Sequence, residues 1–154
     1  MELDELKKRY AEHEKKFGLP DYKEMNDDFE IDKIDRDSDT FLRVIRKVMM
    51  EKIVNSMGFV DMLLNPVNAP RIYYSYIKSM SSEDKKIIEK IYSFLADISV
   101  ASLALEIDSD DKKEAVLIKR TFQGWKAHKK EFEKIIANMN KPNSNIKKEK
   151  TYFG

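Results

Sequence analysis

Apolar side chains recur at every third or fourth position along most of this 154-residue chain. Near the start, Leu3, Leu6, Tyr10, His13 and Phe17 follow one another at alternating spacings of three and four residues. Such spacing puts the side chains on one face of an α-helix and is typical of an amphipathic helix that buries that face. No long segment alternates at every second residue, so the pattern predicts an all-α fold.

Glycine, proline and capping residues divide this pattern into separate helices. Gly18 and Pro20 end the first, because glycine takes the left-handed C′ conformation and proline cannot continue a helix. Pro66 ends the second helix, because the residue before a proline is biased away from the helical conformation. The predicted helices are residues 3–17, about 38–65, a short helix from Pro70, 82–107 and about 110–140. We therefore expect an antiparallel helical bundle of four main helices plus the short one.

The predicted domain organisation is simple. We expect residues 1–141 to form a single helical domain, in which residues 19–39 are an acidic irregular connector packed on the bundle. Pro20 is able to start a short helix through Tyr22 and Met25. Three large apolar residues would then pin the connector to the core: Phe29, Ile31 and Ile34. Residues 142–154 are expected to be a basic flexible tail.

The predicted helix over residues 82–107 is apolar on most sides. Its richest part, residues 91–107, is interrupted by Asp97 and is shorter than the roughly 20 apolar residues of a membrane span. Small residues such as Ala101 and Ala104 would let neighbouring helices approach closely. We therefore predict that this is the central helix of the bundle.

The sequence lacks the residues and motifs that several classes of chemistry require. The chain has no cysteine, which removes disulfides, thiol nucleophiles and cysteine-based metal sites. Its four glycines are isolated, so it contains neither a phosphate-binding glycine loop nor a Gly-x-Ser-x-Gly elbow. We expect a protein that is not an enzyme and has no cofactor.

One acidic cluster invites a calcium interpretation. Asp35, Asp37 and Asp39 have the alternate spacing that opens an EF-hand loop. The pattern then fails, because Thr40 and Arg46 stand where that loop needs a glycine and a bidentate glutamate. We interpret the three acids as residues that cap the following helix.

Three other polar residues could belong to a site. The two histidines, His13 and His128, lack the Glu-x-x-His spacing of di-iron bundles, and His13 falls on an apolar seam. We expect His13 to be a core or boundary residue with one hydrogen bond. Asp97 would have a raised pKa if it were buried, but its helical neighbours indicate a more polar side that touches solvent.

Charge is unevenly distributed along the chain. The first 39 residues carry six more acidic than basic side chains, whereas residues 112–154 carry eight more basic than acidic ones. The last predicted helix has an apolar seam, interrupted by Lys129, that consists of Ala115, Ile118, Phe122, Trp125, Phe132, Ile136 and Met139. The cations of this helix lie on adjacent rows opposite the seam, and they continue into the tail. This predicted basic face consists of Lys112, Lys113, Lys119, Arg120, Lys126, Lys134, Lys141, Lys147 and Lys148.

These observations favour a non-enzymatic helical module for protein–protein interaction, which binds a protein partner or forms a homodimer. The alternative is an RNA- or ribosome-associated protein that binds phosphates through the basic face. The absence of cysteine and the charged N-terminal segment, which lacks an apolar signal, predict a cytoplasmic protein without membrane contact.

Overall fold

The computed structural model describes residues 1–35 and 37–139, and within them every regular element is helical. The α-helices are α1 (Leu3–Phe17), α2 (Tyr22–Phe29), α3 (Phe41–Leu64), α4 (Tyr74–Ser79), α5 (Ser82–Ile107) and α6 (Asp111–Met139). Short 3₁₀ turns are η1 (Ile31–Lys33), η2 (Pro66–Asn68) and η3 (Arg71–Tyr73). The predicted all-α fold and helical bundle are confirmed.

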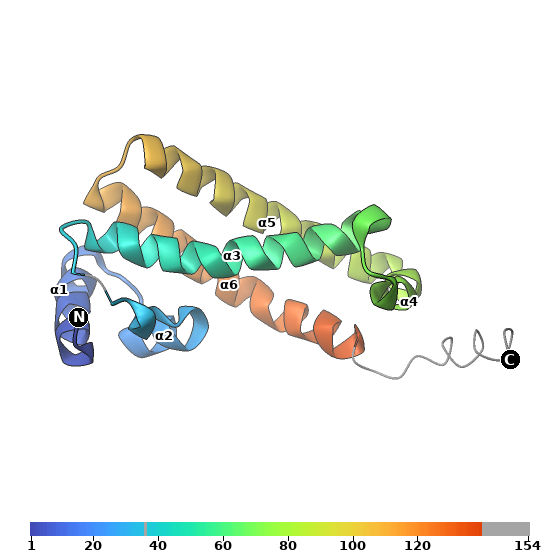
Figure 1. Ribbon diagram of the computed structural model, residues 1–154, viewed down its shortest axis with the longest axis horizontal. Coiled ribbons are helices and arrows are strands. Elements are labelled where there is room, and N and C mark those ends of the chain that lie inside the picture. The colour runs from blue at the N-terminus through green and yellow to red at the C-terminus, as the bar shows by residue number, and fades with distance from the viewer. Residues whose placement is uncertain (36, 140–154) are drawn as a thin grey trace, which may run out of the picture.

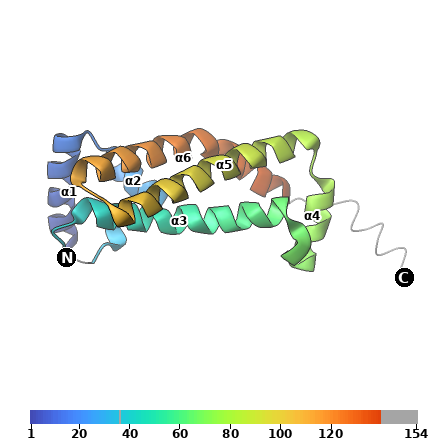
Figure 2. The same ribbon diagram turned by 90° about the horizontal axis from the view of Figure 1, so that it is seen from above.

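Three long helices form the body of the molecule. Helices α3, α5 and α6 run alternately up and down the long axis, while α1 crosses one end of them and α4 lies at the other end (Figures 1 and 2). Of the four predicted main helices, α1 is the one that does not run along the bundle axis (Figure 1). It lies across the end because its two fully buried residues, Leu6 and Tyr10, are one turn apart and cover only a short patch.

The acidic connector packs on the bundle as expected, and the short helix predicted through Tyr22 and Met25 is present as α2. The Asp21 carboxylate accepts hydrogen bonds from the backbone N–H groups of Lys23 and Glu24, which starts α2. The predicted anchors Phe29, Ile31 and Ile34 are all buried. Their burial fixes α2 and η1 against the bundle on the side opposite α5 (Figure 1).

The inner face of α6 follows the predicted seam for most of its length. Ile118 and Trp125 are buried, but near the end of the helix Ile135 is 4% exposed while the predicted seam residue Ile136 is 38% exposed. The last residue of the predicted seam, Met139, is buried again. Lys129, which interrupts the seam, is paired with Asp28 of α2.

Helices α5 and α6 approach each other closely at Gly124. A Cβ atom at this position would overlap the ring of Phe94 on α5, so glycine is needed for the close approach. Phe94 in turn packs beside His128, with ring centroids 5.1 Å apart. Within residues 1–35 and 37–139, no helix is long and apolar enough to cross a membrane.

Candidate interaction surface

The outer side of α5 carries exposed aliphatic residues. We had predicted α5 as the central helix, but in the described part of the chain no helix covers this side (Figure 2). Together with one residue of α6 they form what we call the aliphatic patch: Val100 (65% exposed), Leu103 (65%), Ile107 (90%) and Val116 (60%). The opposite side of α5 supplies the core residues Ile91, Leu95 and Ile98.

A shallow groove adjoins the aliphatic patch between α5 and α6. It has a volume of about 340 Å³ and is mainly apolar, with cationic side chains at its rim. Its lining residues are Ala101, Leu105, Lys112, Lys113, Val116, Leu117 and Arg120. The groove can therefore accept an aliphatic side chain from another molecule, and its rim would attract negative charge.

A buried ion pair lies directly behind this groove. Arg46 of α3 and Glu114 of α6 are each 1% exposed, and Nε of Arg46 donates to Oε2 of Glu114 at 2.6 Å. Arg46 also donates to the Ser102 hydroxyl at 2.5 Å and to Glu106 at 2.8 Å, both on α5. Ser109 in the loop between α5 and α6 donates to the other Glu114 oxygen at 2.6 Å. All three long helices thus meet at one guanidinium.

This network shifts two pKa values. Hydrogen bonds from Arg43 and Arg46 lower the pKa of Glu106 from 4.5 to about 2. Burial acts to lower the pKa of Arg46, but hydrogen bonds to Glu114 and Glu106 outweigh it, so this pKa is raised. Both side chains therefore stay charged over the whole neutral and mildly acidic range.

The sequence analysis did not find this network, although a signal for it exists. Arg46 lies on the four–three–four row of Leu42, Met49 and Ile53, where an apolar residue is expected. Glu114 occupies an equivalent position before Ile118 on α6. One basic and one acidic residue on two apolar seams are the pattern expected of a buried pair, since isolated buried charges are rare.

Part of the predicted basic face is occupied by the N-terminal helices. Nζ of Lys119 donates at 2.8 Å to the carbonyl of Phe17, the last residue of α1, where backbone acceptors are left over. Lys126 pairs with Glu24 of α2 at 2.7 Å on the surface. These two residues therefore contribute to holding α1 and α2 against α6.

Other members of the basic face point outward. Lys112, Arg120 and Lys134 are exposed and form no ion pair with another residue of the described ranges. Lys113 is exposed and pairs with Asp108 at 2.7 Å, which raises its pKa. Lys141, Lys147 and Lys148 lie outside the described residues. The predicted face is thus divided, and its first part coincides with the groove rim.

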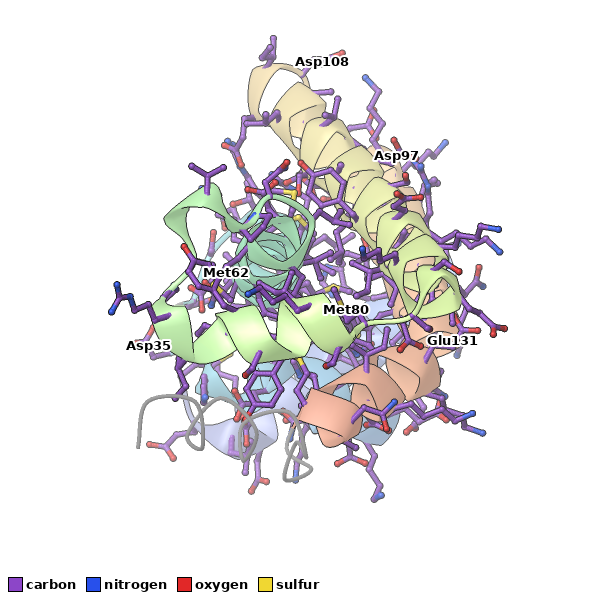
Figure 3. All side chains as sticks on the ribbon, turned by 90° about the vertical axis from the view of Figure 1, so that its right-hand side faces the viewer. Asp35, Met62, Met80, Asp97, Asp108 and Glu131 are labelled. Carbon is purple, nitrogen blue, oxygen red and sulfur yellow. The ribbon has the colours of Figure 1, made fainter. Side chains whose placement is uncertain are left out.

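The other candidate site residues form ordinary contacts within the fold or face solvent. His13 is half-buried, and its Nδ1 lies 2.8 Å from the carbonyl of Arg9, as expected of a boundary histidine. Asp97 is exposed on the outer side of α5 and points away from the bundle (Figure 3). The interpretation of the acidic cluster as helix caps is wrong, because the N-cap of α3 is Thr40, without a side-chain hydrogen bond, and Asp37 pairs with Arg9 of α1. Over residues 1–35 and 37–139, no three potential ligands converge on a point where a metal ion could bind.

Comparison with known proteins gives no match to a family model, to a curated protein or to a solved structure. The aliphatic patch, the groove and its cationic rim are therefore the observations from which a function can be inferred.

Replacing Glu114 with leucine should destabilise the protein by about 3–5 kcal/mol, because Arg46 is left buried with an incomplete set of acceptors. The double variant Arg46→Met/Glu114→Leu should recover most of this loss, since a matched apolar pair needs no charge compensation. Urea unfolding of the wild type, Glu114→Leu, Arg46→Met and the double variant measures the coupling between the two residues. Additive effects of the two single substitutions would contradict the proposed pairing.

The lowered pKa of Glu106 makes stability depend on pH. The folded state favours the charged carboxylate, so its contribution is complete above about pH 4.5 and is lost as the pH falls towards 2. Between pH 5 and pH 2, the free energy of unfolding should fall more steeply for the wild type than for Glu106→Gln, and the two should converge at the acidic end. If the free energies of unfolding of the two proteins fell in parallel with pH, protonation of Glu106 would not be linked to folding.

Proposed function

We propose that this protein is a non-enzymatic interaction module that binds another polypeptide chain through the outer surface of α5 and the start of α6. The observation that carries the proposal is the row of exposed aliphatic side chains on the outer side of α5, Val100, Leu103 and Ile107, together with the exposed Val116, which lines the apolar groove between α5 and α6. Single exposed aliphatic residues are ordinary, whereas a contiguous patch with a polar rim is typical of a binding surface.

The surroundings of the patch support the same function. The groove gives a recess for an anchoring side chain, and Lys112 and Arg120 supply a charged rim of the kind that surrounds interface cores. The buried network of Arg46 and Glu114 holds the two lining helices in fixed positions. A rigid surface loses little entropy on binding, which favours affinity.

Leu103→Glu places a charge in the centre of the patch and should abolish the interaction while leaving the fold intact, because Leu103 is largely exposed. Ile72→Glu is the matched control, since Ile72 is 70% exposed in η3, which leads into α4 at the far end of the bundle from the patch (Figure 1). Tagged full-length wild type and both variants are purified from the native cell after nuclease treatment, and bound proteins are compared quantitatively.

A protein retained by the wild type and by Ile72→Glu, but lost with Leu103→Glu, is the expected result. Circular dichroism and thermal unfolding establish that both variants fold. Identical sets of bound proteins for the two variants would exclude the aliphatic patch as the binding surface.

A second candidate function is contact with RNA or a ribosome through the outward cations of α6. The supporting observation is that Lys112, Arg120 and Lys134 are exposed without an ion-pair partner among the described residues. Such cations can neutralise phosphates without base recognition. Lys119 and Lys126 are less suited to this role, because α1 and α2 already engage them.

The triple variant Lys112→Glu/Arg120→Glu/Lys134→Glu tests this candidate without disturbing the contacts to α1 and α2. Binding of a fluorescent single-stranded RNA is measured at several salt concentrations. RNA contact predicts that wild-type affinity falls with salt and that the triple variant loses at least tenfold in affinity. Equal affinities of the two proteins would exclude these cations as an RNA surface.

A further inference from the structure

We infer that the groove between α5 and α6 receives a partner α-helix that carries an acidic, an aliphatic and a second acidic residue at intervals of four. The inference rests on the proposed function and states the chemistry of the partner segment at that surface. Two observations carry it: the charge of the residues that line the groove, and their spacing along α6.

Every charged residue in the lining of the groove is a cation. Within the described chain the lining contains no acid, and its three cations, Lys112, Lys113 and Arg120, accompany four apolar residues. Lys113 pairs with Asp108, whereas Lys112 and Arg120 have no ion-pair partner in residues 1–35 and 37–139. A segment that enters the groove therefore meets apolar surface together with two cations that no carboxylate engages.

Acidic residues do lie near this end of the bundle, but they do not line the groove. The Asp108 carboxylate accepts from Nζ of Lys113 at 2.7 Å, and the Asp110 carboxylate accepts from the backbone N–H of Lys113 at 2.9 Å. Asp97 and Asp111 are exposed and are absent from the lining. The carboxylates of the buried network behind the groove are matched by arginines. A carboxylate in the groove would thus have cations as its charged neighbours among the lining residues.

The two unpaired cations flank an aliphatic side chain on one row of α6. Lys112, Val116 and Arg120 are spaced four residues apart, so they lie on the same side of the helix. The two cations are about 12 Å apart along the axis, since an α-helix rises about 1.5 Å per residue. Val116 is 60% exposed between them. Along α6 the groove therefore presents a cation, an aliphatic residue and a cation.

A second helix matches this row because it has the same rise. Residues four apart on a helix that packs along α6 would meet Lys112, Val116 and Arg120 in turn. An aliphatic residue in the middle would contact Val116, and an acid on each side would reach one cation. The pattern reads the same in both directions, so the match does not depend on which way the partner helix runs.

The surroundings of the row favour a helix over an extended segment. An extended chain would bring unpaired backbone N–H and C=O groups onto the surface of α5 and α6, whose own backbone groups are used within the helices. A helix satisfies its backbone internally and lays one face into a groove. Its remaining apolar side chains would lie against Leu103 and Ile107, which are exposed beside the groove.

Fluorescence anisotropy with two labelled peptides tests the charge pattern. Both peptides are alanine-rich helices of about 20 residues. One carries a Glu–Leu–Glu row at intervals of four, and the other carries a Lys–Leu–Lys row. The full-length wild type should bind the first peptide roughly tenfold more tightly than the second, and added salt should weaken this binding. Equal affinities, or no binding of the first peptide at about 1 mM protein, would overturn the inference.

Reversing the two cations gives the reciprocal test. Lys112→Glu/Arg120→Glu should lose the preference for the Glu–Leu–Glu peptide and prefer the Lys–Leu–Lys peptide instead. Both residues are exposed, so the variant should fold, and circular dichroism checks this. Lys85→Glu/Lys86→Glu is the matched control, because these exposed cations lie at the start of α5, at the other end of the bundle (Figure 1). A folded reversed variant that keeps the wild-type preference would show that these cations do not select the partner.

The inference and the proposed function can fail separately. If a native protein is lost with Leu103→Glu but is retained, even at high salt, by Lys112→Glu/Arg120→Glu, the surface binds a polypeptide without the inferred acids. If the wild type binds single-stranded RNA through these cations and binds neither peptide, they contact phosphates and the inference is wrong. If neither variant changes the bound proteins and neither peptide binds, both proposals are wrong.

Discussion

The buried ion pair of Arg46 and Glu114 is the constraint on which the arrangement of the three long helices depends. Apolar seams alone allow helices to slide past one another, because many aliphatic contacts are nearly equivalent. A guanidinium at 1% exposure must meet its carboxylate and hydroxyl partners, since an uncompensated buried charge costs several kcal/mol. Only one register of α3, α5 and α6 brings Ser102 and Glu114 to Arg46. This register also sets the end of α5 beside the start of α6 and so forms the groove.

Contacts between α6 and the N-terminal helices account for part of the uneven charge distribution along the sequence. Lys119 binds the end of α1, and Lys126 and Lys129 pair with acids of α2. Part of the basic C-terminal region is thereby used to attach the acidic N-terminal region. The attachment lies on the side of the bundle away from α5 (Figure 1). Helices α1 and α2 consequently bury the flanks of α3 and α6, and the outer side of α5 is left without a cover in the described chain.

An uncovered second seam on α5 links the fold to the proposed function. A helix that served only the core of this bundle would carry polar residues at positions 100, 103 and 107, since exposed aliphatic side chains add nothing to folding stability. Their presence is explained if a second helix covers them.

Local spacing was sufficient to determine much of this protein from its sequence. It indicated the helices, the end of α1 at Gly18, the burial of Trp125 and the anchoring of the connector by Phe29, because a period of 3.6 residues specifies which side chains share a face. It could not decide which of two apolar faces of α5 meets the core, and it led to the wrong prediction that this helix is central. The burial of Arg46 and the engagement of Lys119 also depended on tertiary structure, since their partners lie 68 and 102 residues away in the chain. A helical period carries no information about such distant pairings, and the packing of the helices alone decides them.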